Sequence, residues 1–257
     1  MLLAIDIGNT NITLGIWDGR SWQREWRLHT DSDRTADEFG ILLTSLLREA
    51  QLETAIDAVI LSSVVPRLSD TFSQLCEEYL QLDPLQVNAQ TDSGITIRTE
   101  NPAEVGADRI VNAAAAFHLF KGPCIVIDMG TATTFDVISS KSELLGVVIA
   151  PGLRLAADAL VNRAAQLAHV PLQAPPQVMG RNTVHAIQSG LIFGYTSLAE
   201  GMVQRLLAEH PDAGQKIQII GTGGLINLIA PHTDIIDHVD PWLTLTGLRV
   251  IHERVRR

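Results

Sequence analysis

The sequence predicts an α/β protein made of two similar lobes, and two observations carry this prediction. The segment IDIGNTNIT at 5–13 resembles IDMGTATTF at 127–135, an offset of 122 residues from Asp6 to Asp128 and about half the chain. Each half is also expected to begin with three short strands and to continue with alternating helices and strands. Because repeats of about 20 to 50 residues would indicate a solenoid, a single repetition at half length favours two similar domains.

The first half opens with apolar stretches that are separated by turn signals. Asp18 and Gly19 form a strong hairpin signal between two of these stretches. Further on, apolar residues recur at helical spacing, and Pro66 suits the first turn of a helix. The expected strands span 1–7, 11–17, 22–29, 58–63 and 85–87, and the expected helices span 35–50, 66–80 and 103–120.

The second half repeats this order of elements. The expected strands span 124–128, 133–139, 144–149, 216–220 and 234–236, and the expected helices start at Pro151 and span 183–209, 225–230 and 243–257. Three strands in a meander, followed by alternating helix and strand, is the order of a ribonuclease-H-like lobe. We therefore expect a first ribonuclease-H-like lobe at 1–120 and a second at 121–257, facing each other across a central cleft.

Composition limits the class of protein and its partners. The 257 residues are 46% hydrophobic and 19% charged, which excludes a disordered chain. The net charge of -10 disfavours nucleic acid and anionic lipid as partners. The only cysteines, Cys76 and Cys124, form no CxxC pair and fit a reducing compartment. No apolar run approaches the ~20 residues of a membrane span, and Asp6 interrupts the apolar N-terminus, so we expect a cytoplasmic protein.

Each copy of the repeat places an aspartate at the end of a buried strand, followed by glycine and a Thr-rich turn. Glycine lets backbone amides approach an anion, Thr and Asn add donors, and the carboxylate can hold a hydrated Mg²⁺ that bridges phosphate oxygens. One copy alone would most simply be an ordinary Asp-Gly β-turn. Two copies at a half-length offset instead favour a phosphate site that uses Asp6 and Asp128.

Three further segments are candidate sites on spacing alone. Asp108 and Arg109 start an expected helix, where taken alone they are more simply a dipole partner or cap and a surface charge than a catalytic pair. The segment 146–152 joins a strand to a helix and can offer amides to an anion. The glycines of 221–224 follow a buried strand, where a nucleotide loop and a plain turn are about equally favoured.

Several catalytic motifs are absent from the sequence. None of the three lysines follows a Gly-x4-Gly loop, so there is no P-loop. The lack of GxGxxG after the first strand and of GxSxG weighs against dinucleotide binding and serine hydrolysis. The eight histidines are scattered without HExxH, which favours surface or packing roles over metal binding.

Taken together, these segments make the sequence resemble the type III pantothenate kinases, within the superfamily of acetate and sugar kinases, Hsp70 and actin. The resemblance covers nearly the whole chain and implies the actin-like ATPase fold. It also implies a homodimer that uses ATP, Mg²⁺ and K⁺ or NH₄⁺ to make 4'-phosphopantothenate from pantothenate, the first step of coenzyme A synthesis. The segments that carry it are DIGNTN at 6–11, SSVVP at 62–66, NPAEVGADR at 101–109, DMGTATTFD at 128–136, APG at 150–152, GRNTVHAIQSG at 180–190 and GTGGL at 221–225.

The resemblance further implies roles for individual residues. Asp6 matches a carboxylate near Mg²⁺ and the ATP phosphates, and Asp128 matches one beside the phosphates and the monovalent cation. Asp108 matches the catalytic base, Arg109 a pantothenate contact, and Thr183 a pantothenate contact at the dimer interface. The other implied contacts are Gly8, Asn9, Thr10, Asn11, Gly130, Thr131, Thr133, Gly221, Gly223 and Gly224 for ATP and its phosphates, and Gly106 for the substrate.

The chain departs from the family pattern at two places. Thr99 and Glu100 stand where the family commonly has Tyr-Asp, which removes an aromatic wall from the implied pantothenate site. Gly146 and Val147 replace a common Gly-Gly pair. Neither change touches the three carboxylates. The alternative functions are another small-molecule kinase or a phosphatase of the same fold, and a transcriptional accessory factor.

Overall fold

The chain forms two compact units in the structure, a computed structural model that describes residues 1–52, 55–163 and 169–256. The first unit comprises Met1–Ala115 together with Leu243–Arg257, and the second comprises Ala116–Trp242. The expected division after residue 120 lies close to the observed one. The terminal segment 243–257, by contrast, belongs to the first unit and not to the second lobe, where the sequence analysis puts it.

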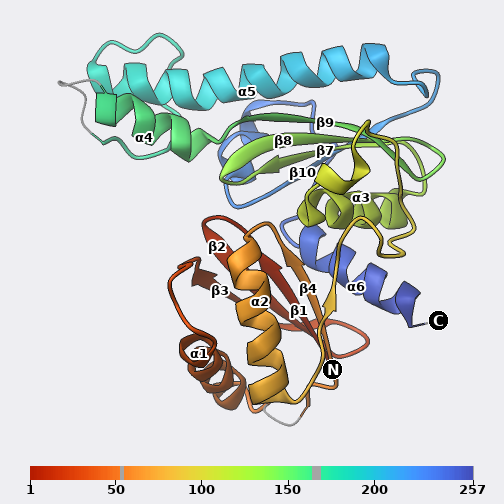
Figure 1. Cartoon of the computed structure of the whole chain (residues 1–257). Helices are drawn as coiled ribbons and strands as arrows, with labels where there is room; N and C mark the ends of the chain where they lie inside the picture. Colours follow the sequence, from red (N-terminus) through yellow and green to blue (C-terminus); the bar gives the residue numbers. More distant parts are fainter. Residues whose placement is uncertain (53–54, 164–168, 257) are drawn as a thin grey trace. The chain divides into compact units, whose positions relative to one another are not determined.

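The first unit is built on a five-stranded sheet in the order β3-β2-β1-β4-β5 (Figure 1). The first three strands run antiparallel, and β4 and β5 are added in parallel to β1. The strands are β1 (Leu2–Ile7), β2 (Asn11–Trp17), β3 (Trp22–His29), β4 (Ala58–Ser63) and β5 (Leu85–Gln86), and a short strand β6 (Thr96–Ile97) follows along the chain.

Two helices cover one face of this sheet. Helix α1 (Ala36–Glu49) begins with a capping box between Thr35 and Glu38, and α2 (Pro66–Leu75) begins with its proline. Their apolar sides bury Phe39 and Phe72, whose ring centroids lie 5.0 Å apart, against the β1, β2 and β4 side chains of this face. The helix expected over 66–80 is α-helical only to residue 75, because a π-helical turn, η1 (Cys76–Leu80), completes it.

Helix α6 (Leu243–Val255) covers the opposite face and contacts β1, β2 and β4. Its Leu245 lies so close to Gly15 that a Cβ there would approach it to 2.8 Å. Burial of Leu245, Leu248 and Ile251 is the physical reason that this terminal helix joins the first unit. Helix α3 (Ala107–Phe120) starts later than the expected 103–120, because a separate 3-10 turn, η2 (Pro102–Glu104), precedes it.

The second unit has a sheet with the strand order β11-β10-β7-β8-β9. Its long helices α4 (Leu153–Arg163) and α5 (Thr183–Glu209) contribute Leu153, Ile187 and Leu191 to a core that packs on one sheet face. The expected helix at 183–209 is confirmed. The strands are β7 (Cys124–Met129), β8 (Ala132–Ile138), β9 (Glu143–Pro151), β10 (Gln218–Thr222) and β11 (His238–Val239).

Two predictions in this unit are wrong. The strand expected at 234–236 lies instead at β11, because pairing with β10 begins only at Asp237, whose N–H donates to the Ile219 carbonyl at 2.9 Å and whose carboxylate accepts the Ile219 N–H at 2.9 Å. The helix expected at 225–230 is replaced by two 3-10 turns, η3 (Ile226–Leu228) and η4 (Ala230–His232). Over the described part of the chain, no helix has both the length and the apolar character needed to cross a membrane.

Both units therefore share one topology, the ribonuclease-H-like order of three antiparallel strands and two parallel additions. The expected fold class is confirmed. In each unit the first strand is the central one, and every residue of it is buried except one aspartate, Asp6 in β1 and Asp128 in β7. The fold thus carries each carboxylate to the carboxyl end of a central strand, where ligands of open α/β sheets bind.

Candidate functional site

The turn after β1 is closed by its own backbone and by the end of β3. The Gly8 N–H donates to the Asn11 carbonyl at 3.0 Å. From the end of β3, the Thr30 hydroxyl donates to the Gly8 carbonyl at 2.7 Å, and the Thr30 N–H donates to the Thr10 carbonyl at 3.0 Å. These bonds fix the turn while Asn9, Thr10 and Asn11 stay exposed, so their donors are accessible to an anion.

Asp6 projects from the sheet face that α6 covers, away from the core formed with α1 and α2. Its neighbours Ile5 and Ile7 belong to that core, and side chains alternate along a strand. The ladders pair Asp6 with Thr13 of β2 and with Ser62 of β4, so all three side chains leave the sheet on the same side. The sequence analysis gave no role to these two hydroxyl residues, although strand alternation could have indicated them.

Asp108 and Arg109 lie in the first turn of α3, at the end of β4. A Cβ on Gly106 would lie 2.6 Å from the Asp108 Oδ1 and 3.6 Å from the Val64 Cγ1. The Val64 N–H donates to the Ile7 carbonyl at 3.0 Å, which ties the end of β4 to the end of β1. The start of α3 and the turn after β1 are therefore anchored at the same edge of this unit.

The two charged side chains of α3 are paired. An Arg109 guanidinium nitrogen donates to the Asp108 Oδ2 at 2.8 Å, and the Arg109 backbone N–H donates to Oδ1 at 2.8 Å. The Arg109 side chain is only 10% exposed, whereas that of Asp108 is 27% exposed. The buried arginine fixes the direction of a carboxylate that stays accessible.

The turn after β7 is one residue shorter than the turn after β1. The Gly130 N–H donates to the Ala132 carbonyl at 2.9 Å, and Thr131 is exposed. Asp128 is paired with Thr134 of β8 and Thr222 of β10, so these three side chains share a face.

Thr133 lies on the other face, which carries Met129 and Phe135 into the core, and it is 1% exposed. Its hydroxyl is therefore not beside the Asp128 carboxylate. Thr134 is the hydroxyl residue that the sequence analysis missed, and the two-residue period of a strand could have found it.

Two glycines lie against this second turn. A Cβ on Gly223, which has φ of +90°, would lie 2.5 Å from the Asp128 Oδ1. A Cβ on Gly152 would overlap the Thr131 carbonyl and lie 2.7 Å from the Gly130 carbonyl. The loop after β10 and the start of α4 thus meet at the Asp128 turn, and only glycine permits this approach.

Helix α4 begins beside this turn, and α5 holds it there. The Tyr195 hydroxyl donates to the Pro151 carbonyl at 3.0 Å and to the Gly152 carbonyl at 3.3 Å. Burial raises the pKa of the Tyr195 hydroxyl above its usual value. The first amides of a helix attract anions, so the arrangement suits a phosphate group near Thr131.

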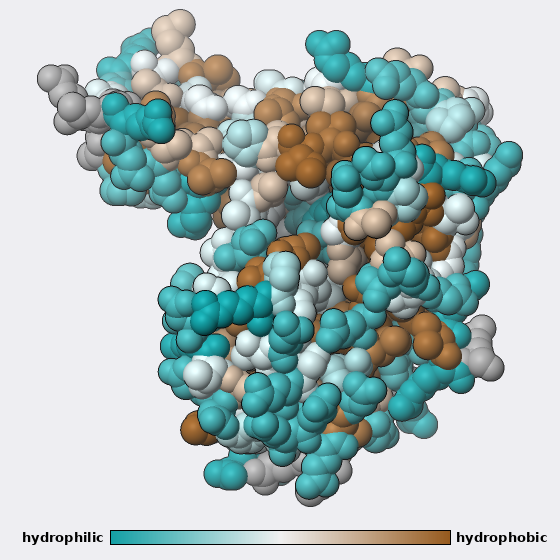
Figure 2. All heavy atoms as spheres, viewed as in Figure 1, coloured by the Kyte–Doolittle hydropathy of each residue, from teal (hydrophilic) through white to brown (hydrophobic). Residues whose placement is uncertain are grey.

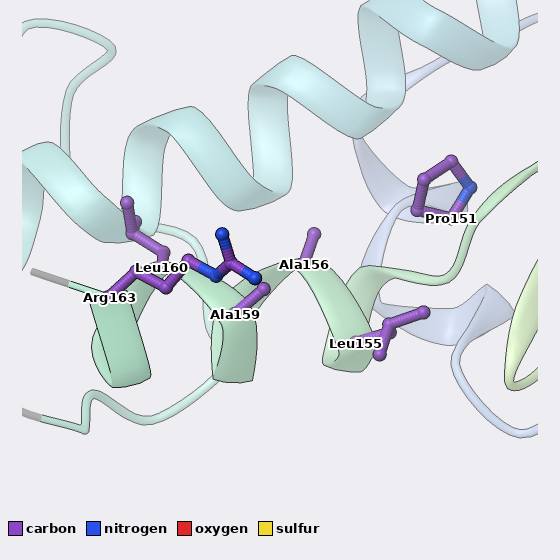
Figure 3. A pocket seen from close by; sticks show the side chains of 6 residues that line it. All are labelled: Pro151, Leu155, Ala156, Ala159, Leu160 and Arg163. Carbon is purple, nitrogen blue, oxygen red and sulfur yellow. The ribbon is translucent and has the colours of Figure 1, made fainter.

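A surface pocket runs along α4, from Pro151 before the helix to Arg163 at its end. Its volume is about 660 Å³, and Figure 3 shows Leu155, Ala156, Ala159 and Leu160 lining it with Arg163 at one end. Further exposed apolar side chains lie in this unit, and Figure 2 shows hydrophobic areas set among hydrophilic residues on the face in view. They include Ile149 at 72%, Val178 at 68%, Met179 at 77% and Val184 at 45% exposed.

Thr183 is the first residue of α5 and is exposed next to Val184. The Asn182 side chain caps this helix by accepting the His185 N–H at 2.8 Å. Thr183 thus stands beside one of the exposed apolar residues of the second unit, Val184.

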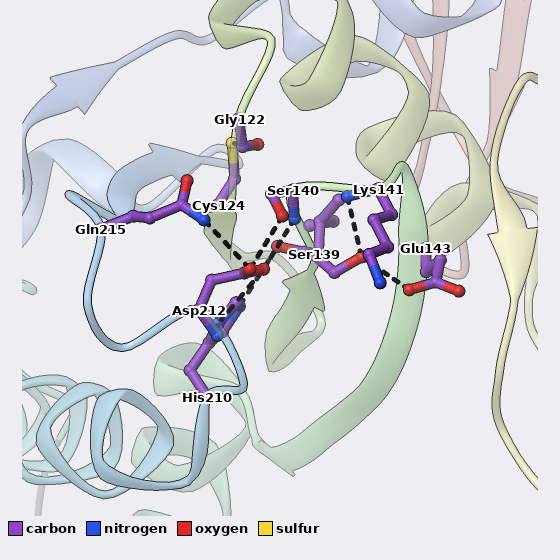
Figure 4. A network of polar contacts seen from close by, with 10 residues as sticks. Gly122, Cys124, Ser139, Ser140, Lys141, Glu143, His210, Asp212 and Gln215 are labelled. Carbon is purple, nitrogen blue, oxygen red and sulfur yellow. Dashed lines mark hydrogen bonds and ion pairs between the residues drawn. The ribbon is translucent and has the colours of Figure 1, made fainter.

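A polar network holds the β8–β9 turn (Figure 4). The Asp212 carboxylate accepts the Ser140 N–H and the Ser140 hydroxyl, each at 2.8 Å, from 72 residues away. The bond from the Ser140 N–H, and after it the bond from the Ser140 hydroxyl, hold the pKa of Asp212 below its usual range. The His210 ring links the same loop to β8, because it contacts the Ile138 carbonyl at 3.2 Å. The network therefore holds the β8–β9 turn at the opposite end of the strands from the Asp128 turn.

Comparison with known proteins agrees with this geometry. A family model described as type III pantothenate kinase matches residues 2–205. A type III pantothenate kinase from Moorella thermoacetica is 48% identical over 255 residues, covering 99% of this chain and 99% of that protein.

Solved structures of low sequence identity share the fold. Component A of (R)-2-hydroxyglutaryl-CoA dehydratase from Acidaminococcus fermentans has a TM-score of 0.57 at 13% identity, covering 99% of this chain and 98% of that one. The inorganic polyphosphate/ATP-glucomannokinase from Arthrobacter sp. strain KM has a TM-score of 0.52 at 14% identity, covering 100% and 99%. The family model and the full-length relative show that this chain belongs to the type III pantothenate kinase family.

Proposed function

We propose that this chain catalyses the ATP-dependent phosphorylation of pantothenate to 4'-phosphopantothenate, the first step of coenzyme A synthesis. The observation that carries the proposal is the repeated strand end, at which Asp6 and Asp128 each stand before a closed turn with exposed donors. Family membership supports the choice of pantothenate among the acceptors that this fold serves.

The donor set at Asp6 fits Mg²⁺. Among the described residues, no three His, Cys, Asp or Glu side chains converge on a common point, so an all-protein metal cage is not formed. Mg²⁺ usually takes one or two carboxylates and completes its shell with phosphate oxygens and water. In the proposed site Asp6 supplies the carboxylate, and the bound ion neutralises charge on the ATP phosphates. Asn9, Thr10 and Asn11 add phosphate contacts.

Asp128 is the second proposed phosphate-site carboxylate. It is proposed to lie beside the ATP phosphates and a monovalent cation such as K⁺ or NH₄⁺. The carbonyls of Gly130 and Thr131, in the turn that follows Asp128, are proposed to offer further oxygen atoms to the cation. Gly221, Gly223 and Gly224 form the loop proposed for the adenosine side, and the approach of Gly223 to Asp128 supports this assignment.

Asp108 is the proposed catalytic base. The hydroxyl oxygen of pantothenate forms a bond to the γ-phosphorus, the bond from that phosphorus to the bridging oxygen of ADP breaks, and the hydroxyl proton passes to the Asp108 carboxylate. The transition state of such transfers is loose, so Asp108 mainly orients the hydroxyl and accepts its proton late. The accessible carboxylate, fixed by Arg109, supports this role.

Arg109 is proposed to bind the pantothenate carboxylate, next to Gly106. A guanidinium group carries five N–H donors in a planar fork, so it can hold a substrate carboxylate while it keeps its bond to Asp108. This contact decides which end of the substrate faces ATP. With Thr99 and Glu100 in place of Tyr-Asp, the arginine carries more of the substrate affinity.

The proposed enzyme is a homodimer in which Thr183 of one subunit completes the site of the other. The exposed apolar residues of the second unit, with Thr183 beside them, support self-association. Mixed dimers that combine Asp108→Ala and Thr183→Ala subunits should recover activity that neither variant shows alone. Absence of recovery would assign complete sites to single subunits.

A cytoplasmic location is part of the proposal. The two free cysteines, Cys76 and Cys124, are buried, and burial raises the pKa of each thiol to about 12. Unreactive, unpaired thiols are consistent with a reducing compartment.

The deciding experiment is transfer of labelled γ-phosphate from ATP to pantothenate, compared with a panel of sugars and acetate. Label in 4'-phosphopantothenate, dependent on Mg²⁺ and a monovalent cation, is expected. Preferred labelling of another acceptor would identify a different kinase of this fold, and label release as phosphate alone would identify a phosphatase.

A further inference from the structure

Ser62, near the end of β4, is a buried polar residue without a structural explanation. It is 0% exposed, and its hydroxyl oxygen has no hydrogen-bond partner among the residues that the structure describes. A hydroxyl that loses water on folding and gains no partner costs free energy, so such groups are rare and call for a reason.

The position of Ser62 suggests that reason. The parallel ladder pairs Ser62 with Asp6, and paired residues project from the same sheet face on strands roughly 4.8 Å apart. The adjacent Ser63 projects from the other face and is satisfied, because its Oγ accepts the Val65 N–H at 3.1 Å. Of these two serines, only the one beside the carboxylate lacks a partner.

The second unit repeats the arrangement. Thr222 of β10 is paired in parallel with Asp128, and it is 2% exposed. When Ser62 is aligned with Thr222, the segments SSVVP at 62–66 and GTGGL at 221–225 share no identical residue. A buried strand is better filled by an apolar side chain, so the recurrence of a hydroxyl beside each aspartate indicates a role at the carboxylate.

We infer that Ser62 is a positioning residue for Asp6, whose hydroxyl donates a hydrogen bond to the Asp6 carboxylate when metal and nucleotide are bound. The bond fixes the rotation of the carboxylate, so that its second oxygen faces the metal ion. Groups that orient a metal ligand typically change metal affinity by about 10- to 100-fold. The inference rests on the proposed function only in that Asp6 is taken as the metal carboxylate.

The test compares two adjacent serines in the full chain. Ser62→Ala removes the unsatisfied hydroxyl, so the Tm without ligands should equal or exceed that of the wild type. The affinity for Mn²⁺ in the presence of ADP, measured by the loss of free Mn²⁺ signal in electron paramagnetic resonance, should fall about 10- to 100-fold. Ser63→Ala, the matched control, should lower Tm and leave Mn²⁺ affinity unchanged.

A second variant separates the hydroxyl from the shape of the side chain. Ser62→Thr keeps the donor, and threonine already occupies the equivalent position 222, so this variant should keep most of the Mn²⁺ affinity. Equal losses in Ser62→Thr and Ser62→Ala would overturn the inference, as would wild-type affinity in Ser62→Ala. If Ser62→Ala does not fold, Ser62→Cys, with a weaker donor of similar size, takes its place in the comparison.

The Mn²⁺ measurement needs no pantothenate, which separates this inference from the proposed function. Weaker Mn²⁺ binding in Ser62→Ala, in a protein that does not phosphorylate pantothenate, supports the role of Ser62 and contradicts the proposed substrate. Active phosphorylation with unchanged Mn²⁺ affinity in Ser62→Ala contradicts the role of Ser62 alone.

Discussion

The turns after β1 and β7 occupy equivalent places in the two units but differ in length. The ladder pairs Ile7 with Ile12 across four residues, whereas it pairs Met129 with Thr133 across three. The offset between the halves therefore changes from 122 before the turn to 121 after it, and Thr13 corresponds to Thr134, both paired with an aspartate. The ungapped repeat matches Thr13 to Phe135, a residue of the other face. The two halves are therefore more alike in structure than the ungapped sequence repeat indicates.

The two turns also differ in what supports them. The first is held by a side chain, the hydroxyl of Thr30. The second is enclosed by backbone, because Gly152 and Gly223 approach it too closely for any Cβ. The first turn should therefore tolerate change in its surroundings better than the second, although each follows the aspartate of a central strand.

The largest expected effect concerns the two carboxylates. Asp6→Asn and Asp128→Asn should each reduce turnover to background, because each removes a charge at the phosphates while the strand stays intact. Circular dichroism should remain that of the wild type. Near wild-type rates at saturating Mg²⁺ in either variant would show that the two strand ends are not equivalent in function.

Asp108→Asn tests the carboxylate that has no counterpart in the repeat. A general base contributes roughly 10² to 10⁴ in rate, or about 2.7 to 5.4 kcal/mol of barrier, whereas a helix cap contributes about 0.5 to 2 kcal/mol of stability. We expect kcat to fall at least about a hundredfold with Tm and ATP affinity nearly unchanged. Retained kcat with lower Tm would make Asp108 structural and direct attention to Glu104.

Gly152→Ala tests the backbone enclosure of the second turn. The new Cβ overlaps the Thr131 carbonyl, so the free energy of unfolding should fall by about 1 to 3 kcal/mol and ATP affinity should fall with it. The matched control is Gly146→Ala. Gly146 lies within β9, which Gly152 directly follows, and a Cβ at position 146 meets no described atom within 4 Å. Equal stability of the two variants in urea unfolding would contradict the enclosure.

The smallest expected effect concerns two aspartates that hold hairpin turns, Asp18 at the β2–β3 turn and Asp212 at the β8–β9 turn. Asp18 accepts the Arg20 and Ser21 N–H groups within its own turn, whereas Asp212 reaches Ser140 across 72 residues. Hydrogen bonds lower the pKa of both carboxyls in the folded protein. Their contribution to the free energy of unfolding is therefore fully present above the unfolded pKa of about 3.9 and is lost as pH falls through the lower folded pKa.

We expect Asp212→Ala to lower Tm at pH 7 more than Asp18→Ala, because Asp212 joins two distant segments. Both variants should also lose less stability than the wild type when pH falls from about 5 to 2. Thermal melts across this range provide the measurement. A larger effect from Asp18→Ala would mean that the local turn matters more than the long-range network.

The sequence alone was sufficient for the two halves, most strands and the long helix at 183–209, because hydrophobic period and turn residues are local properties. It also singled out Asp6, Asp108 and Asp128 through motifs. Only the tertiary structure assigned the helix at 243–255 to the first unit, since its apolar side is buried on β1, β2 and β4, which end at least 180 residues earlier in the chain. Strand pairing likewise decided that Thr134 and not Thr133 shares a face with Asp128, and that Ser62 and Thr222 stand beside the two carboxylates. Such pairings depend on register between distant strands, which no local pattern specifies.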